Sequence, residues 1–353
     1  MKKRDNSIDI LRGIAILIMF GANVLGYVTP CSRHPMWFAI ASSMAAPLFI
    51  MISGYMAAQN AASKSRGASY YLIRGGMLIL TGVLIDAMIW RILPFASFDV
   101  LYLIGLSLPA VYLLRKASDW IKCVAVAATL AATFLLQQAW PYAENPVEIE
   151  YLLPGADFSA YTPANFIKGM LYDGWFPVFP WIGAAIAGSI FASVRSRMYR
   201  GFADMKVAAT GAVTAIAGIA GVYLFYSSEA PFDMLASREP YGEIFYPSTP
   251  LFMIGGLGAC ILAMAIADAT QELKVWKPVM VLGRASLFNY IVHIAIINFA
   301  ISPLFEDNEQ PLSTGWIVYA ALAASCLALS WGVSVMKSRV KSDNFFYKFY
   351  FGG

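Results

Sequence analysis

Residues 8–28 read IDILRGIAILIMFGANVLGYV, an apolar run long enough to cross the hydrocarbon core of a bilayer as a helix. The basic residues 2–4 precede this run and resemble the start of a signal peptide. Arg12 and Asn23 interrupt the run, however, and no small-residue cleavage motif is evident. We therefore interpret residues 8–28 as a retained first transmembrane helix.

Similar apolar runs recur along the whole chain. Hydrophobic residues make up 59% of the 353 positions and charged residues only 13%, a balance that water-soluble globular domains do not normally show. We predict an all-α fold: a polytopic membrane protein whose residues 1–353 form a single domain, one bundle of about ten transmembrane helices. The predicted helices cover residues 8–28, 36–58, 70–90, 99–114, 120–140, 175–194, 206–226, 248–269, 279–301 and 315–336.

The basic residues occupy alternate connections between these helices. They gather at residues 2–4, 64–66, 115–116, 195–206, 274–277 and 337–348. The opposite connections carry few basic residues and more acids. By the positive-inside rule, both termini are predicted to be cytoplasmic, and we expect a multi-pass protein of the inner (cytoplasmic) membrane.

Composition also limits the cofactors and partners. The net charge of +4 is spread over the ends of segments rather than along one face, so no nucleic-acid partner is expected. The four cysteines lie far apart and without metal-binding spacing, so we expect no metal cofactor. The lipid bilayer is the expected partner of most of the surface.

The two histidines are the first candidates for chemistry. His34 follows the first predicted helix on the outer side, and His293 lies well inside the predicted helix 279–301. Asn23 lies in the outer part of the first helix, so we expect the three side chains near one depth. An imidazole can act as base or nucleophile, and an amide N–H can stabilise an oxyanion. The alternatives are an ordinary loop histidine, a packed histidine and an interhelical hydrogen bond from Asn23.

Three arginines fall inside predicted helices near their cytoplasmic ends. Arg12, Arg74 and Arg284 are expected at similar depth, where guanidinium groups can bind phosphate oxygens in a bidentate manner. One alternative is local neutralisation, because Asp9 and Arg12 stand at i, i+3. Another is that all three arginines are snorkelling anchors.

Carboxylates and aromatic residues in the outer half are further candidates. Asp86, Asp99 and Asp173 can orient an imidazole or bind a polar acceptor, although solvation is the alternative for Asp99 and Asp173. Residues 175–181, WFPVFPW, place two prolines and two indoles at the outer interface. An aromatic belt accounts for the tryptophans, whereas the paired prolines favour irregular backbone beside a cavity, which makes Trp181 a candidate substrate-binding residue.

Five short motifs occur in a characteristic order. They are SIDILRGIA at 7–15, APLFIMISG at 46–54, FDVLYLIG at 98–105, FPWIG at 179–183 and LGRASLFNYIVH at 282–293. With Asn23 after the first motif and His34 and Trp37 before the second, this order resembles the transmembrane acyltransferase superfamily. That group includes acyltransferase-3 proteins and the catalytic domain of heparan-alpha-glucosaminide N-acetyltransferase.

The resemblance implies an acyltransferase that uses acetyl-CoA or another acyl-CoA from the cytoplasm. It implies transfer to an extracytoplasmic acceptor, a sugar hydroxyl or amine, with His34 as catalytic histidine and Asn23 as its helper. His293 is a further catalytic candidate, and Trp37 joins the substrate-binding candidates. The chain departs from the heparan-type pattern after Trp37. The acidic and Asn/Gly residues of that pattern are replaced here by Phe38, Ala39, Ser42 and Ser43.

Several questions stay open at this point. Direct transfer and an acyl-histidine intermediate are both compatible with the residues. A homodimer is possible by the same analogy. The alternative function is a transporter or flippase for a small polar or saccharide-linked substrate, in which the buried charges form a substrate or proton path.

Overall fold

The computed structural model describes residues 4–30, 33–63, 66–140, 148–151, 158–159, 161–226, 244–246, 248–305, 310–340 and 344–351. Residues 2–3, Lys64 and Lys341 of the charge pattern lie outside this part of the chain. The longer helices are α1 (Asn6–Val28), α2 (Met36–Ser43), α3 (Ala45–Ser63), α4 (Ala68–Ile85), α5 (Val100–Leu113), α6 (Asp119–Ala139), α8 (Val178–Arg197), α9 (Met205–Tyr226), α11 (Pro250–Thr270), α12 (Trp276–Arg284), α13 (Ser286–Ile296) and α15 (Leu312–Arg339). The shorter elements include α7 (Pro163–Lys168), α14 (Ser302–Phe305), α16 (Phe345–Phe351) and the π-helical turns Asp86–Trp90, Gly169–Asp173 and Ile297–Ile301.

The all-α prediction is confirmed. The described residues form no strand, only an isolated bridge between Ile92 and Glu150, and they contain nine helical spans long and apolar enough to cross a membrane. The predicted helix at 99–114 also forms, as α5, but its 14 residues make it shorter than those spans. Asp99 caps its first turn, and the 3₁₀ turn Leu114–Lys116 follows its end.

Two predicted helices are broken in the structure. The predicted helix 36–58 divides into α2 and α3 at Met44, and the predicted helix 279–301 divides into α12 and α13 at Ala285. Each half keeps an apolar composition, so hydropathy alone does not reveal the break. In a bilayer such breaks occur where the backbone is buried in protein or lines a cavity.

Glycine brings α1 and α12 into direct backbone contact. A Cβ atom on Gly13 would lie 2.0 Å from the backbone oxygen of Val279, and one on Gly283 would lie 1.9 Å from the backbone oxygen of Asp9. No side chain fits at either place, so glycine lets the two backbones cross closely. This crossing places the first turns of α1 beside the end of α12, and thus beside Arg284.

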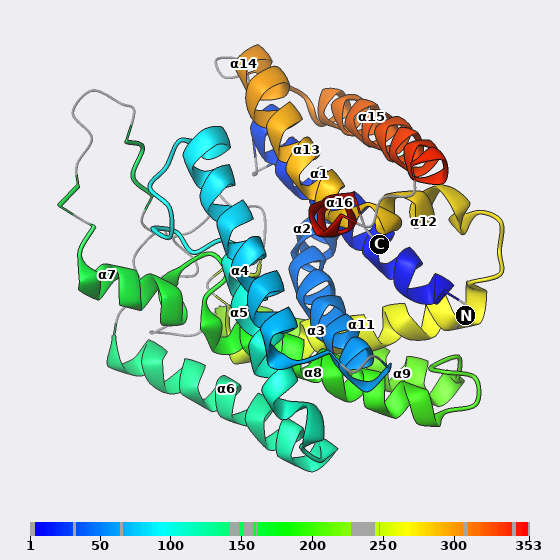
Figure 1. The fold of residues 1–353 in the computed structure, drawn as a ribbon. Helices are drawn as coiled ribbons and strands as arrows, with labels where there is room; N and C mark the ends of the chain where they lie inside the picture. The colour runs from blue at the N-terminus through cyan, green and yellow to red at the C-terminus, as the bar shows by residue number, and fades with distance from the viewer. Residues whose placement is uncertain are drawn as a thin grey trace.

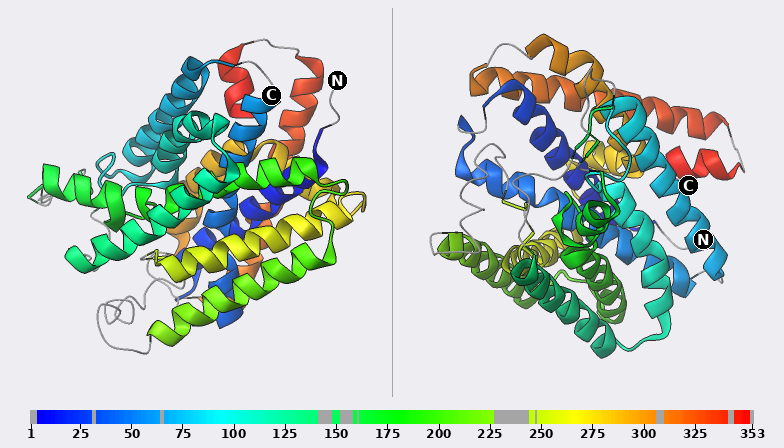
Figure 2. Two further views of the ribbon diagram at one scale, coloured as in Figure 1. Left: turned by 90° about the horizontal axis from the view of Figure 1, so that it is seen from below. Right: turned by 90° about the vertical axis from the view of Figure 1, so that its left-hand side faces the viewer.

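The two termini lie at the same end of the molecule, beside α12 and α15 (Figures 1 and 2). The nine spans of the described residues and α5 together make an even number of membrane crossings. An even number of crossings places both termini on one side, in agreement with this arrangement. The side of the membrane that this end faces remains the prediction from the charge distribution. We call it the terminal end below.

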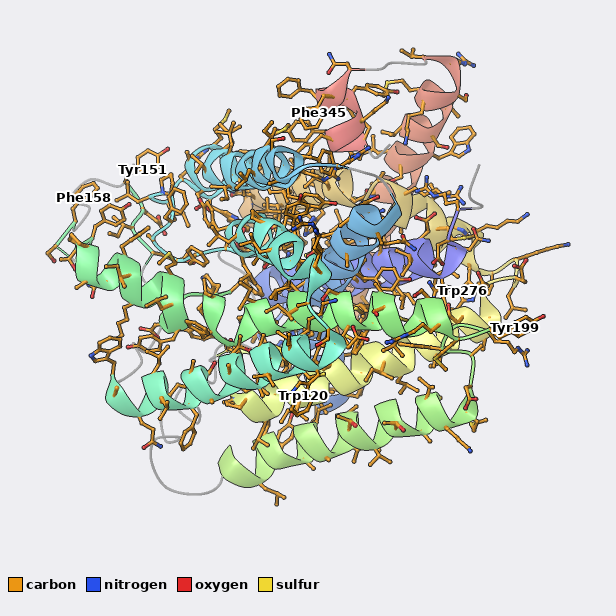
Figure 3. The ribbon with its side chains drawn as sticks, turned by 60° about the horizontal axis from the view of Figure 1, so that its bottom comes forward. Trp120, Tyr151, Phe158, Tyr199, Trp276 and Phe345 are labelled. Atoms are coloured by element: carbon orange, nitrogen blue, oxygen red, sulfur yellow. The ribbon has the colours of Figure 1, made fainter. Side chains whose placement is uncertain are left out.

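Apolar side chains also cover much of the outer surface. On α6, Trp120, labelled in Figure 3, is 75% exposed, and Leu135 is 65% exposed. On the outer faces of α9 and α15, Ile216 and Ile317 are exposed to a similar degree. Large side chains of this kind are stable in contact with lipid, so the chain is a multi-pass membrane protein with the bilayer as its partner.

Candidate functional site

Asn23 and His293 meet in the interior between α1 and α13. The Nδ2 atom of Asn23 lies 3.0 Å from Nε2 of His293, and Nδ1 of His293 lies 2.9 Å from the backbone oxygen of Asn289. A carbonyl oxygen only accepts, so Nδ1 carries the proton and donates it to Asn289. In the neutral ring Nε2 then accepts a hydrogen bond from the Asn23 amide. His293 is completely buried, so this pairing satisfies both of its nitrogens.

Two aromatic rings pack against His293, and one of them is hydrogen-bonded to a carboxylate. The Phe20 ring centre lies 5.0 Å from the imidazole, and the Tyr290 ring packs against it edge-on at 5.7 Å. The Tyr290 hydroxyl donates to Oδ2 of Asp99 over 2.8 Å. Asp99 therefore positions the Tyr290 ring, which in turn packs against His293. Asp99 itself does not contact the imidazole directly.

The other two predicted carboxylates have partners elsewhere. Asp86 begins the π-helical turn after α4 and accepts a hydrogen bond from the Tyr102 hydroxyl. Asp173 ends the turn Gly169–Asp173 and forms an ion pair of 3.0 Å with Lys168. Both side chains are buried, so these bonds compensate for the lost hydration.

His34 lies beyond the end of α1 and is half-buried. Its Nε2 atom is shielded from solvent and finds no hydrogen-bond partner among the described residues. Burial lowers the pKa of His34 from its ordinary value of 6.5, while backbone groups of Leu25 and Thr29 act in the opposite direction. Within the described residues, no hydrogen bond joins His34 to Asn23 or His293. The structure thus brings two of the three predicted residues together and leaves His34 as a separate, neutral imidazole.

The two predicted tryptophans occupy different environments. Trp37 is 61% exposed and stacks on Trp316 of α15, with ring centres 5.9 Å apart. Phe38 joins this pair to His34, because its ring contacts both Trp316 and the imidazole. Trp181 is completely buried, and its Nε1 has no partner in the described part of the chain. Trp316 is an addition that hydropathy did not single out.

The predicted arginines gather at the terminal end. Arg12 donates from Nε and Nη2 to the Ser286 hydroxyl over 3.2 and 2.6 Å. Asp9 accepts instead from Nε of Arg284 at 3.1 Å and from Nε of Arg4 at 2.6 Å. The hydrogen bonds of Asp9 thus go to Arg4 and Arg284, and the guanidinium of Arg12 binds a hydroxyl on α13.

Further cations lie within electrostatic range of these residues. The charges of Arg4 and Arg74 act on Arg12, and the charges of Arg4, Arg12 and Arg284 act on Lys337. We call Arg4, Arg12, Arg74, Arg284 and Lys337 the cationic cluster. Sequence reasoning missed Arg4 and Lys337, which lie in the terminal charge runs used to predict topology.

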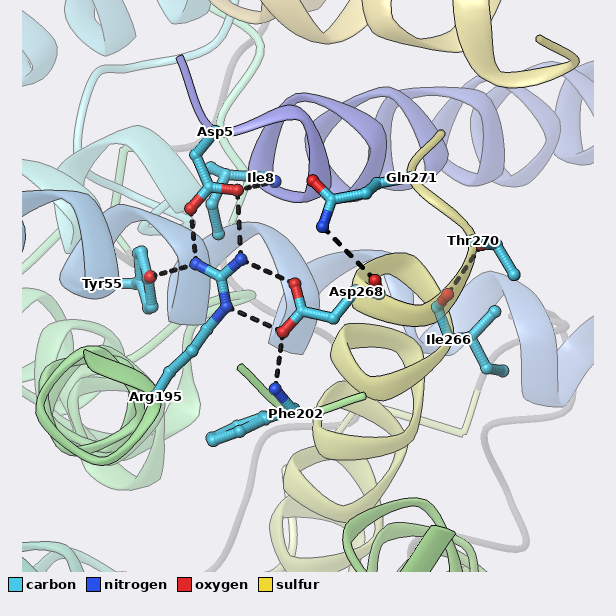
Figure 4. Close-up of polar contacts among 9 residues, drawn as sticks. All are labelled: Asp5, Ile8, Tyr55, Arg195, Phe202, Ile266, Asp268, Thr270 and Gln271. Atoms are coloured by element: carbon cyan, nitrogen blue, oxygen red, sulfur yellow. Dashed lines mark hydrogen bonds and ion pairs between the residues drawn. The ribbon is translucent and has the colours of Figure 1, made fainter. Parts of the chain in front are cut away.

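A second charged group at the terminal end has a structural role. Arg195 of α8 donates from Nη2 to Oδ1 of Asp268 over 2.6 Å and from Nη1 to the Tyr55 hydroxyl over 2.6 Å, and it also binds Asp5 (Figure 4). The backbone N–H of Phe202 donates to Asp268 over 2.7 Å. These bonds join the start of α1 to α3, α8 and α11. Because the guanidinium is so fully engaged, we assign Arg195 to stability rather than to ligand binding.

The described residues contain no group of three His, Cys, Asp or Glu side chains placed to hold a metal ion. The polar centres that remain are an amide paired with an imidazole in the interior, a second imidazole beyond the end of α1, and cations at the other end. Such a set suits proton transfer and the binding of a phosphorylated molecule.

Comparison with known proteins adds a family match. Residues 4–231 match the family described as heparan-alpha-glucosaminide N-acetyltransferase, catalytic. The matched region contains Arg12, Asn23, His34 and Arg74, and it ends before Arg284 and before α13. No individually curated protein matches the chain.

Proposed function

This chain belongs to the heparan-alpha-glucosaminide N-acetyltransferase catalytic family, and from that membership we propose that it transfers an acetyl group from acetyl-CoA to an acceptor across the membrane. The acceptor is a sugar hydroxyl or amine, in keeping with the glucosaminide in the family description. The membrane is the inner membrane, with the terminal end in the cytoplasm. Homodimerisation belongs to the same proposal and is tested by the mass of the purified protein.

The cationic cluster supports the donor end of this proposal. The nucleotide part of acetyl-CoA carries several phosphate groups, and guanidinium groups bind phosphate oxygens through two parallel hydrogen bonds. Arg12 and Arg284 currently bind a hydroxyl and a carboxylate, both of which a phosphate can replace as acceptors. Arg74 lies within electrostatic range of Arg12 and adds a third guanidinium.

One face of α1 connects this cluster to the reacting groups. Arg12, Ile16, Phe20 and Asn23 follow each other at helical spacing and therefore share a face. Ile16 and Phe20 are completely buried, so the side chains between the two polar positions are closely packed. In our proposal the acyl arm of the donor passes along this face after Ile16 and Phe20 have moved.

His34 and Asn23 would divide the chemistry. The Nε2 atom of His34 takes the proton of the acceptor O–H or N–H, and the acceptor atom forms a bond to the acetyl carbon. The C–S bond breaks, and the departing thiolate takes the proton from the imidazolium. One N–H of the Asn23 amide is held by His293, and its second N–H is available to stabilise the oxyanion. His293 then acts as a positioning residue.

The aromatic group near His34 supports a sugar acceptor. Trp37, Phe38 and Trp316 pack together beside the imidazole, and Trp37 presents much of its indole surface to the outside. A flat apolar surface next to a polar base suits the apolar face of a sugar ring.

One observation supports the proposal most strongly: the cationic cluster and the base His34 lie at opposite ends of α1, a helix of the matched region. The cationic cluster lies at the start of α1. The Nε2 atom of His34, which has no hydrogen-bond partner among the described residues, lies beyond its end. We expect purified protein to transfer radiolabelled acetyl from acetyl-CoA to a hexosamine, and His34→Ala to abolish transfer while still binding coenzyme A. An active His34→Ala enzyme would contradict the assignment. Radiolabel trapped on the wild-type chain and absent from His34→Ala would identify an acyl-histidine route.

A further inference from the structure

The C-terminal helix α16 lies directly on the cationic cluster. Its sequence is FFYKFYF, and it packs beside α13, as Figure 1 shows in dark red. The Phe349 side chain is only 3% exposed, and its ring centre lies 5.4 Å from the guanidinium carbon of Arg74. The backbone oxygen of Phe351 accepts a hydrogen bond from Nζ of Lys337 over 3.3 Å. Two cations of the cluster are therefore covered by one short helix.

These two contacts have the chemistry of a bound nucleotide. The Arg74 guanidinium lies over the Phe349 ring, a cation–π contact that an aromatic base can also make. A phosphate oxygen can accept from the Lys337 ammonium group as the Phe351 carbonyl does. Arg74 and Lys337 thus present to α16 the same groups that they would present to the donor. The base and phosphate of the donor cannot occupy this place while α16 is there.

Two further contacts attach α16 to the bundle. The Tyr350 hydroxyl shares a 3.2 Å hydrogen bond with Oγ1 of Thr81 on α4, and the Phe351 ring packs on Phe288 of α13 at 5.6 Å. The helix follows residue 231, so it is not part of the region matched by the family. Its contacts therefore join α16 to Arg74, which lies inside the matched region, and to Lys337, which lies outside it.

We propose that Arg74 and Lys337 form the subsite for the nucleotide end of acetyl-CoA, and that α16 occupies this subsite until the donor displaces it. This inference rests on the proposed function, because it assumes a coenzyme A donor. The apparent affinity of a site that is open only part of the time is reduced by the open fraction. Weakening the contacts of α16 should therefore strengthen donor binding, the opposite of what removing a binding residue would do.

The test is equilibrium binding of coenzyme A to the purified full-length protein, measured by calorimetry. Phe349→Ala removes the ring on Arg74, and Tyr350→Phe removes only the hydrogen bond to Thr81. Phe346→Ala is the matched control, because Phe346 lies in the same helix but is 62% exposed. We expect Phe349→Ala to bind coenzyme A at least about threefold more tightly, Tyr350→Phe to change in the same direction, and Phe346→Ala to match the wild type. Thermal unfolding checks that each variant is folded.

A double variant tests the subsite itself. In the Phe349→Ala background, Lys337→Gln should weaken coenzyme A binding roughly tenfold, because the ammonium group is then a direct ligand of the nucleotide. Unchanged binding in the double variant would overturn the subsite assignment. Unchanged or weaker binding by Phe349→Ala would overturn the role of α16 and leave the acetyl-CoA proposal standing. Failure of the wild type and all variants to bind coenzyme A would overturn both.

Discussion

The Nδ2 atom of Asn23 lies 3.0 Å from the Nε2 atom of His293, although the two residues are separated by 270 positions in the chain. Because Nδ1 of His293 donates to the backbone of Asn289, the direction of this contact is determined: the amide donates and the imidazole accepts. The lone pair that a general base would use is therefore already engaged. This relationship distinguishes the two histidines and supports the proposed role of His34 as the base.

We predict unequal and non-additive effects at this pair. Asn23→Ala removes a candidate oxyanion donor and should lower kcat about 100-fold with little change in the KM for acetyl-CoA. His293→Ala should lower kcat less, because it only releases the amide from its position. The double variant should be no slower than Asn23→Ala, since residues that act as a unit are not additive. Losses in kcat that multiply would show that His293 acts independently.

The pH dependence of acetyl transfer should reflect the lowered pKa of the partly buried His34. Burial lowers the pKa of His34 below 6.5, so the ring is neutral and able to accept a proton at neutral pH. We expect the acid limb of the kcat/KM profile to have its midpoint below pH 6.5. A midpoint above that value would assign the limb to another group.

The same pKa shift has a consequence for stability. Well above pH 6.5, His34 is neutral in both the folded and the unfolded chain and contributes nothing to the pH dependence of stability. As the pH falls below 6.5, the unfolded chain binds the proton first, so the folded state loses stability until the folded pKa is reached. His34→Gln should remove this part of the pH dependence of the melting temperature.

Removing a cation from the donor site should weaken donor binding selectively. Arg12→Gln should raise the Kd for coenzyme A by about 10-fold or more, because a charge-assisted hydrogen bond contributes about 1.5–3 kcal/mol. Arg197→Gln is the matched control, since Arg197 lies outside the cationic cluster and its side chain is 64% exposed. An equal loss of binding in both variants would indicate a general effect of positive charge.

The ionic group around Arg195 should determine stability rather than catalysis. Arg195→Met leaves Asp268 buried without its charged partner, which should destabilise the fold by about 3–5 kcal/mol. Arg197→Met removes a more exposed pair and should change stability by about 1 kcal/mol or less. Thermal unfolding in detergent measures both. A similar melting temperature for the two variants would show that the Arg195 group does not hold the helices together.

Much of the fold is predictable from hydropathy, because each apolar run of about 20 residues has only one stable form in a bilayer. The helical spans therefore agree closely, and the expected α5 forms as well. The breaks at Met44 and Ala285 were not predicted, since both halves of each helix are apolar. The short helix α16 was missed for a different reason: seven residues are too few to span a membrane.

The site was predictable only in part. Depth along a helix predicted that Asn23 and His293 lie near each other, and the structure adds the direct contact. Depth alone does not predict which neighbouring side chain forms a hydrogen bond with a charged residue. Asp9 was weighed as a local partner of Arg12, but its hydrogen bonds go to Arg284 and Arg4, because the Gly13 and Gly283 crossing brings α12 alongside α1.

The central claim is that the acetyl group is transferred across the membrane. It is tested most directly by supplying donor and acceptor on defined sides. Protein is reconstituted in sealed vesicles, and protease access to the C-terminus identifies the side on which the terminal end faces. Acetyl-CoA is then supplied on one side and a hexosamine on the other, with His34→Ala as the inactive control. We predict acetylated hexosamine only when acetyl-CoA is on the side of the terminal end and the acceptor is on the opposite side. Acetylated product formed only when donor and acceptor share one side would contradict transfer across the membrane.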